Sequence, residues 1–164
     1  MPSQVKAIPQ GYHAVTPYLV VNDGNRAIEY YKKAFGATEV NRMAGPGGKI
    51  GHAELKIGDS MIMLSDEMPG GTGHSPQSLG GSSVSIFLYV EDVDSVFNQA
   101  VKSGGKADMA PKDMFWGDRF GKLTDPFGHL WALATHIEDI APQEMEKRAK
   151  AAMAEMSQAA GQTA

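Results

Sequence analysis

The sequence predicts an α+β fold built from two tandem βαβββ modules, and an internal repeat is the main evidence. Segments 19–40 and 88–109 of the 164-residue chain align without a gap, 69 residues apart. In both copies a strand-like run precedes a helical pattern that ends at glycine. The identical pairs are Leu19/Leu88, Val21/Val90, Asp23/Asp92, Lys33/Lys102 and Gly36/Gly105. Such a repeat indicates two similar supersecondary units, and any ligand site is expected where they meet.

The first module is expected over residues 14–66, after an N-terminal tail at 1–13. Its first strand, 18–21, ends at a turn-forming Asn-Asp-Gly sequence. A helix follows over 25–35, because apolar residues recur there at helical spacing, and Gly36 ends it. The remaining strands of this module are expected at 38–43, 50–57 and 61–65.

A linker at 67–83 separates the first module from the second, which is expected over 84–137. The linker contains many Gly, Ser and Pro residues and almost no large apolar side chain, which is typical of a mobile connection. The second module repeats the order of the first, with a strand at 84–90 and a helix at 93–101. Its remaining strands are expected at 106–110, 119–124 and 130–135. A DPFG turn joins the last two of these strands.

Composition and charge narrow the class of protein. The net charge of −4 is spread along the chain, which argues against a nucleic-acid partner because nucleic acids select a basic surface. The sequence contains no run of about 18 apolar residues, so it predicts no transmembrane helix. Residues 1–13 also lack the apolar core of a signal peptide. With no cysteine, the chain has no disulfide and no thiolate nucleophile. We expect a cytoplasmic protein with a small-molecule ligand and no membrane partner.

Three segments carry a family resemblance. They are 30–37 (YYKKAFGA), 50–67 (IGHAELKIGDSMIMLSDE) and 115–139 (FWGDRFGKLTDPFGHLWALATHIED). They resemble the vicinal oxygen chelate superfamily, which includes glyoxalase I, bleomycin resistance proteins and extradiol dioxygenases, and within it the PhnB-like branch. The resemblance extends over about residues 14–137. It implies that the sheets curve around a cleft. It also implies a homodimer, since modules of this family often complete each other's clefts across chains.

The resemblance further implies four metal-ligand positions, on the first and last strands of each module. Metal-dependent members of the family typically hold a divalent metal there with two His and two Glu, and the metal acts as a Lewis acid. In this sequence the matching residues are Thr16, Met63, Ser85 and Ala132. None of them is a competent ligand for a divalent metal. We therefore predict no metal, no other cofactor, and none of the family's metal-dependent activities.

The leading hypothesis is a metal-free, PhnB-like protein that binds a small organic molecule in an apolar and aromatic cleft. The residues expected to bind it are Tyr18, Met61, Met63, Phe87, Tyr89, Trp116 and Arg119. Methionines adapt to irregular ligands, although they also suit a packed core. Trp116, Asp118 and Arg119 would supply a stacking surface, an acceptor and a bidentate donor. Alternatively, these residues have only a structural role, in which Arg119 pairs with a neighbour and Trp116 covers the edge of the cleft. Whether the protein is an enzyme is left open.

A second hypothesis is an enzyme with a displaced site, with or without a metal, built from His52, Glu54, Asp118 and Arg119. Such an enzyme would act as a lyase, isomerase or dioxygenase on a small oxygenated substrate. His52 and Glu54 share one face of a strand, which suits an acid/base pair or half of a metal site. A histidine that fixes the strand by a hydrogen bond is the structural alternative. The catalytic hypothesis requires all four groups to converge, whereas His136 is interpreted as a local cap.

The C-terminal region, 138–164, is expected to contain one helix, 142–156, and a frayed tail. Pro142 is favoured in the first turn of a helix. A stripe of apolar side chains follows one side of this helix: Met145, Ala149, Ala152, Met153 and Met156. We interpret the stripe as a core or dimer contact. A third hypothesis is therefore a subunit that acts only through this helix.

Overall fold

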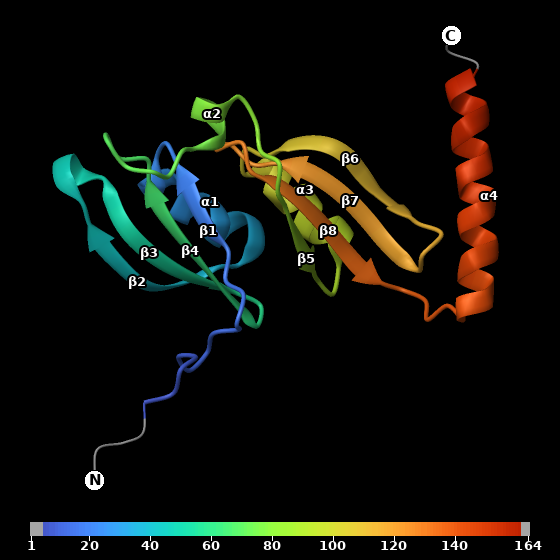
Figure 1. Cartoon of the computed structure of the whole chain (residues 1–164), viewed down its shortest axis with the longest axis horizontal. Helices are drawn as coiled ribbons and strands as arrows, with labels where there is room; N and C mark the ends of the chain where they lie inside the picture. Colours follow the sequence, from blue (N-terminus) through green and yellow to red (C-terminus); the bar gives the residue numbers. More distant parts are fainter. Residues whose placement is uncertain (1–4, 162–164) are drawn as a thin grey trace.

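Two four-stranded mixed sheets, each accompanied by one long helix, make up the body of the protein (Figure 1). The computed structural model describes residues 5–161. The first sheet has the strand order β1-β4-β3-β2 and the second the order β5-β8-β7-β6. In each sheet the first strand runs parallel to the last, and the other neighbours are antiparallel. The predicted α+β class and the tandem βαβββ order are confirmed.

The elements follow the predicted order, with small shifts at their ends. The first module consists of β1 (Tyr18–Val21), α1 (Gly24–Phe35), β2 (Thr38–Ala44), the 3-10 turn η1 (Pro46–Gly48), β3 (Ile50–Ile57) and β4 (Ser60–Asp66). The second consists of β5 (Ser85–Tyr89), α3 (Val93–Lys102), β6 (Lys106–Asp113), β7 (Asp118–Thr124) and β8 (Leu130–His136). The short helix α2 (Pro76–Leu79) lies between the modules, and α4 (Pro142–Gly161) follows them.

The same interaction attaches each long helix to the last strand of its own module. Asp66, at the end of β4, accepts a hydrogen bond of 2.9 Å from the backbone N–H of Gly24, the first residue of α1. Thr135, 69 positions later in the sequence, accepts one of 2.9 Å from the backbone N–H of Val93, the first residue of α3. The repeat seen in the sequence therefore extends to the contacts that place the helices.

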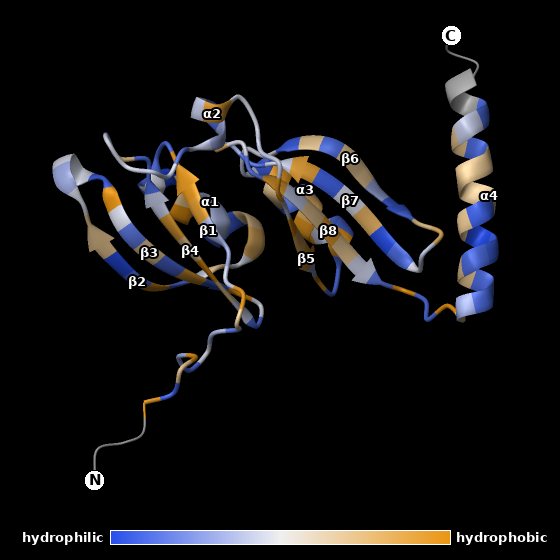
Figure 2. Cartoon of the chain, in the orientation of Figure 1, coloured by the Kyte–Doolittle hydropathy of each residue, from blue (hydrophilic) through white to orange (hydrophobic). Residues whose placement is uncertain are grey.

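The hydrophobic core is continuous across the two modules. α1 packs against α3, and both helices lie behind the strands in Figure 1. Figure 2 shows apolar residues along β1, whereas the first turns of α4 are hydrophilic. The largest fully buried side chains of the core include Trp131, Tyr31, Phe127, Ile28 and Leu55. Burial of this apolar surface is the main force that holds the modules together.

A buried carboxylate joins the first module to the second. Asp125, in the turn between β7 and β8, accepts hydrogen bonds from the Tyr31 hydroxyl at 2.7 Å and the Trp131 indole N–H at 2.9 Å. Its other oxygen accepts the backbone N–H groups of Phe127 and His129, at 2.9 and 3.0 Å. Tyr31 belongs to α1, so the contact crosses between modules. Burial, and then the charge of Asp125, raise the pKa of Tyr31 well above its usual value.

The segment 67–83 contains α2, and the side chain of Glu67 at its start contacts residues at the start of that helix. The Glu67 carboxylate accepts the backbone N–H of Ser75 at 2.9 Å and the hydroxyl of Ser78 at 2.7 Å, and it lies 3.0 Å from Nδ1 of His74. These hydrogen bonds, that of the Ser78 hydroxyl first, lower the pKa of Glu67 to about 2. The composition of the segment does not predict α2. The mobility of the segment stays a prediction.

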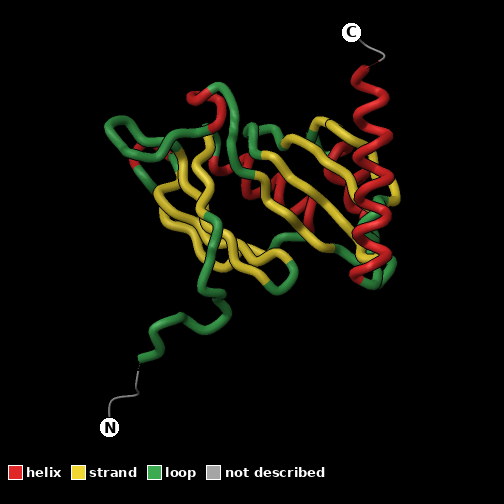
Figure 3. The backbone as a smooth tube through the Cα atoms, turned by 45° about the vertical axis from the view of Figure 1, so that its right-hand side comes forward, coloured by secondary structure: helices red, strands yellow, loops and turns green. Residues whose placement is uncertain are grey.

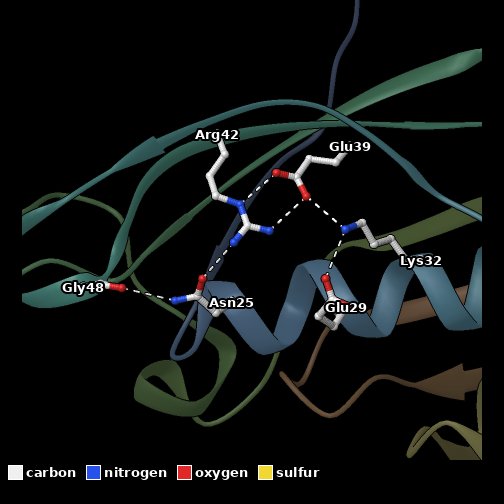
Figure 4. Close-up of polar contacts among 6 residues, drawn as sticks. All are labelled: Asn25, Glu29, Lys32, Glu39, Arg42 and Gly48. Atoms are coloured by element: carbon white, nitrogen blue, oxygen red, sulfur yellow. Dashed lines mark hydrogen bonds and ion pairs between the residues drawn. The ribbon is translucent and has the colours of Figure 1, made fainter.

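The outer strand β2 is tied to α1 by a network of charged and amide side chains (Figure 4). Arg42 donates to both carboxylate oxygens of Glu39, at 2.8 and 2.9 Å, and to Oδ1 of Asn25 at 3.0 Å. Lys32 lies 3.1 Å from Glu39, and Asn25 donates to the backbone oxygen of Gly48 at 3.2 Å. Arg42 is the main cause that holds the pKa of Glu39 below its ordinary value. The network fixes a strand whose own side chains are mostly exposed.

In Figure 1 the helix α4 stands away from both sheets, and in the turned view of Figure 3 it passes in front of the second sheet. It extends beyond Met156, where the sequence predicts its end. Met153 and Met156 are 65% and 72% exposed, so this part of the Met and Ala stripe does not pack in the core of the chain. Arg148 connects α4 to the preceding segment by donating to both carboxylate oxygens of Glu138, at 2.8 and 2.9 Å. Within residues 5–161, no helix has the length and apolar character of a membrane span.

Replacing Tyr31 by Phe removes one donor to Asp125 and keeps the ring that packs in the core. We expect the free energy of unfolding to fall by about 1–3 kcal/mol, the cost of leaving a buried acceptor short of a partner. Urea unfolding followed by circular dichroism measures the change. Tyr30→Phe is the matched control, because the Tyr30 hydroxyl donates only to the backbone oxygen of Ala100, at 3.3 Å. A loss no larger for Tyr31→Phe than for Tyr30→Phe would contradict the role of Asp125.

Candidate functional site

The second sheet exposes aromatic side chains on the face opposite the core. Phe87 and Tyr89 of β5 are 48% and 60% exposed. The ring centroid of Phe87 lies 4.9 Å from that of Tyr89 and 5.6 Å from that of Phe120 on β7. Trp116 packs edge-on against Phe120, with the centroids 5.5 Å apart. We call these four side chains, Phe87, Tyr89, Trp116 and Phe120, the aromatic face.

Small residues on β8 allow the rings of the aromatic face to meet. Ala132 is the register partner of Phe87, and Ala134 is the partner of both Tyr89 and Phe120. The two alanines are buried in one cluster with Phe120. Without large side chains between β5 and β7, the rings pack together: Phe120 is buried, and Phe87 and Tyr89 form the exposed aromatic surface. A surface of this kind suits a planar ligand that stacks on it.

A buried carboxylate lies at one end of the aromatic face. Asp118, 3% exposed, accepts hydrogen bonds of 3.1 Å from the Tyr89 hydroxyl and from the Trp116 indole N–H. Its other oxygen lies 2.8 Å from Nδ1 of His136, and Nε2 of His136 lies 3.0 Å from Asp139. Hydrogen bonds to the carboxylate of Asp118 first, and then to that of Asp139, raise the pKa of His136. We call Tyr89, Trp116, Asp118 and His136 the Asp118 cluster.

Gly117 places Trp116 in the Asp118 cluster by letting two parts of the chain approach closely. Its φ of 93° lies in the left-handed region, and a Cβ at this position would come within 2.3 Å of the backbone oxygen of Glu138. The Gly117 oxygen accepts the backbone N–H groups of Ile137 and Glu138, at 2.9 and 3.0 Å. Gly117 therefore lies directly against the segment that follows β8. This contact fixes the neighbouring Trp116 near His136.

A groove between the two modules begins beside the Asp118 cluster. It has a volume of about 780 Å³ and its lining includes Phe35, Ile57, Leu88, Tyr89, Glu91 and His136. We call it the inter-module groove. A smaller cavity of about 240 Å³ shares Ile57 and Leu88 with the groove and is also lined by Met61 and Phe87. Both hollows lie where the modules meet, which is where the repeat predicts a ligand site.

The first sheet carries a separate polar group on its own outer face. The Tyr18 hydroxyl lies 3.1 Å from Nδ1 of His52, and Nε2 of His52 lies 3.4 Å from Glu54. Glu54 and Met63 line a cavity of about 430 Å³ together with Tyr12. Tyr18, His52, Glu54 and Met63 are therefore brought together, whereas Phe87, Tyr89 and Trp116 lie on the second sheet.

Arg119 does not belong to the aromatic face. Its guanidinium pairs with Asp94 on α3, with 2.8 Å between Nη2 and Oδ1, and with Asp113 on β6, at 2.9 Å. Asp118 and Arg119 are consecutive residues of β7, so their side chains point to opposite faces of the sheet. With His52 on the first sheet, the residues of the displaced site form three separate groups of contacts. The convergence that the catalytic hypothesis requires is not present in the described residues.

His136 makes one contact that the sequence predicts and one that it does not. The local contact to Asp139, three residues later, agrees with the predicted cap. The contact to Asp118 crosses from β8 to β7, where the two residues are register partners. The DPFG turn is a usable signal, because Asp118 and His136 are each nine positions from Phe127 in the sequence. Phe120 is the member of the aromatic face that the sequence did not single out.

A comparison with protein-family models identifies the fold family. The model of the Glyoxalase/Bleomycin resistance protein/Dioxygenase superfamily matches residues 12–133. The chain belongs to this superfamily.

Similar proteins agree with this membership. An uncharacterised protein of Mycobacterium tuberculosis, Rv0887c, is 43% identical over 136 residues, which cover 81% of this chain and 80% of that protein. The crystal structure of protein PA1353 from Pseudomonas aeruginosa has a TM-score of 0.62 at 27% identity and covers 76% of this chain and 98% of that one. The PhnB protein from Bacillus cereus has a TM-score of 0.59 at 19% identity and covers 75% and 99%. At that identity, the likeness to PhnB shows the fold alone.

The residues at the four metal positions of the glyoxalase superfamily do not fit a divalent metal. The Thr16 hydroxyl donates to the backbone oxygen of His13 at 3.3 Å, and the Ser85 hydroxyl donates to that of Leu130 at 3.4 Å. The other two positions, Met63 and Ala132, offer a thioether and a methyl group, which hard and borderline divalent metals do not select. Among the described residues, no three His, Asp or Glu side chains form a group that could hold a metal ion.

Because these positions lack ligands, the purified protein should not bind a divalent metal tightly. We expect titration with Zn²⁺, Ni²⁺ and Mn²⁺ to give no stoichiometric high-affinity binding in isothermal calorimetry. Preparing the protein without chelator and analysing its metal content gives an independent measurement. His52→Ala is the informative variant, since His52 and Glu54 are the nearest approach to a half-site. Tight stoichiometric metal that is lost in His52→Ala would refute the metal-free interpretation.

Proposed function

We propose that this superfamily member is a PhnB-like protein that binds a small, planar organic molecule without a divalent metal. The ligand lies on the aromatic face and extends into the inter-module groove. The observation that carries the proposal is the exposure of Phe87 and Tyr89, whose rings lie side by side on β5. Tyr89 belongs to both the face and the groove, so one ligand can contact both.

The energetic argument starts from apolar surface that the chain leaves in water. Burying an aromatic side chain such as that of Phe87 stabilises by about 1.5–3 kcal/mol. In the core of this chain such rings are buried, as Phe127 and Trp131 are. The rings of β5 are exposed beside a groove, so a ligand that covers them gains the hydrophobic free energy that folding does not use.

The polar groups at the edge of the site support a small-molecule ligand. Binding sites for small molecules are mostly apolar hollows with a few convergent polar groups that orient the ligand. Here Phe35, Ile57 and Leu88 supply apolar wall, and Tyr89 and His136 supply the polar groups. The charge and hydrogen-bonding capacity of Asp118 are already satisfied by its three partners, so it orients these groups and does not contact the ligand itself.

Binding of naphthalene-2-carboxamide, a neutral planar probe, tests the proposed function. We expect calorimetry to detect binding to the native protein, and the indole N–H resonance of Trp116 to shift in NMR spectra. The double variant Phe87→Ala/Tyr89→Ala should lower the affinity by roughly tenfold or more, because it removes two stacking rings. Leu79→Ala on α2 is the matched control, since Leu79 is an exposed apolar side chain outside the site. No binding to the native protein, or equal losses in both variants, would refute the proposal.

We also propose that the protein is a cytoplasmic homodimer. The support is α4, which stands clear of the sheets and exposes Met153 and Met156 on one side. A second copy of the chain that packs on this side would bury the apolar stripe that the chain alone leaves exposed. The helix is held to its own chain by the ion pair between Arg148 and Glu138.

Light scattering after gel filtration tests the dimer. We expect the native chain to elute with twice its monomer mass, and Met153→Glu/Met156→Glu to elute as a monomer, because two charges would be buried in the contact. Lys147→Gln, on the side of α4 opposite the stripe, should remain a dimer. A monomeric native protein, or a dimer unaffected by the methionine changes, would contradict this contact.

A further inference from the structure

The two ring nitrogens of His136 have partners of different kinds. Nδ1 contacts Asp118, whose side chain is 5% exposed, whereas Nε2 contacts Asp139, whose side chain is fully exposed. An exposed ion pair is worth little, because water competes for both partners. Nε2 is therefore the polar atom of the Asp118 cluster whose present partner a ligand can replace.

Two lysines lie beside the aromatic face. Nζ of Lys122 lies over the Phe120 ring, 5.7 Å from its centroid. Lys112 on β6 is the register partner of Phe120 and therefore shares its face of the sheet. The acidic Asp108 contacts Thr124 at 2.6 Å, at the end of β7 that lies away from Asp118. Both lysines lie beside Phe120, and the two carboxylates at the His136 end of the face, Asp118 and Asp139, are paired with that histidine.

We propose that Nε2 of His136 binds an anionic oxygen of a planar aromatic ligand, such as an aromatic carboxylate, and that this oxygen replaces the carboxylate of Asp139. This inference rests on the proposed function and specifies the chemical class of the ligand. Asp118 accepts from Nδ1–H and keeps the imidazole oriented, so that Nε2–H donates to the ligand. Asp118 is a positioning residue, and Asp139 competes with the ligand for Nε2. His136 is the group that contacts the ligand.

The spacing along the sheet allows one ligand to reach both parts of the site. Tyr89 is the register partner of Ala134 on β8, and His136 follows two residues later on the same face. Two residues of a strand span about 6.6 Å. A fused two-ring acid that stacks beside Tyr89 can therefore place its carboxylate at His136.

The charge of His136 sets the pH range of this interaction. Asp118 and Asp139 raise its pKa above the usual 6.5, and the other titratable groups nearby are Tyr89, through Asp118, and Glu91 in the groove. A raised pKa keeps the imidazolium, and with it the Nε2–H donor, at pH values below that pKa. The donor is lost as the pH rises through it. The preference for an anionic ligand should therefore disappear at pH values above the pKa of His136.

2-Naphthoate and naphthalene-2-carboxamide form a matched pair of probes, because the first carries a carboxylate where the second carries a neutral carboxamide of similar size. We expect calorimetry to show about tenfold tighter binding of 2-naphthoate, the effect of one charge-assisted hydrogen bond. His136→Gln should abolish that preference, so that the two probes bind the variant with equal affinity. Asp139→Ala should strengthen 2-naphthoate binding, because it removes the competing carboxylate. The preference of the native protein should decline over a pH series that crosses the pKa of His136.

The controls separate this inference from the proposed function. His52→Gln changes the histidine on the outer face of the first sheet and should alter neither probe's affinity. If neither probe binds the native protein, the proposed function fails. If both bind equally well, or if the preference persists in His136→Gln, the site exists but His136 does not recognise the anion, and the inference is overturned.

Discussion

The hydrogen bonds that converge on Asp125 constrain how the two modules are arranged. A carboxylate buried between modules is stable only when its oxygens are satisfied, and Tyr31 of α1 and Trp131 of β8 supply two of the four donors. Because these donors come from different modules, Asp125 fixes α1 against the second sheet while the aromatic rings fill the space around it. The interior of the molecule is thereby used for joining the modules. The inter-module groove and the smaller cavity beside it lie at the margin of this interior.

The two modules share a scaffold but present different outer surfaces. Asp66 and Thr135 place the helices in the same way, although one is a carboxylate and the other a hydroxyl. On the outer face of the first sheet, His52 makes polar contacts to neighbouring side chains. The second sheet instead carries rings, which meet because Ala132 and Ala134 leave space between β5 and β7. One repeated unit therefore supports a polar surface and an aromatic surface in the same chain.

The sequence predicts those parts of this structure that depend on local signals. The repeat, the glycines after helices and the DPFG turn are local, and they give the order of the elements. The position of Arg119 depends on strand alternation, which separates it from Asp118 although they are neighbours in the sequence. The partnership of Asp118 with His136 follows from the register of the β7–β8 hairpin, and interpreting His136 as a local cap ignores that register. Whether the methionines of α4 pack within the chain or outside it depends on tertiary contacts, which periodicity alone does not specify.

The segment after β8 links the candidate site to α4. The Gly117 oxygen holds the backbone of Glu138 from one side, and Arg148 of α4 holds its carboxylate from the other. Arg148 also lowers the pKa of Glu138, which keeps the carboxylate charged for this contact. Asp139 follows directly, so its position relative to Nε2 of His136 depends on where α4 lies. In the proposed homodimer, the contact that fixes α4 also fixes Asp139. Access of an anionic ligand to His136 then depends on the assembly of the two chains as well as on the chemistry of the Asp118 cluster.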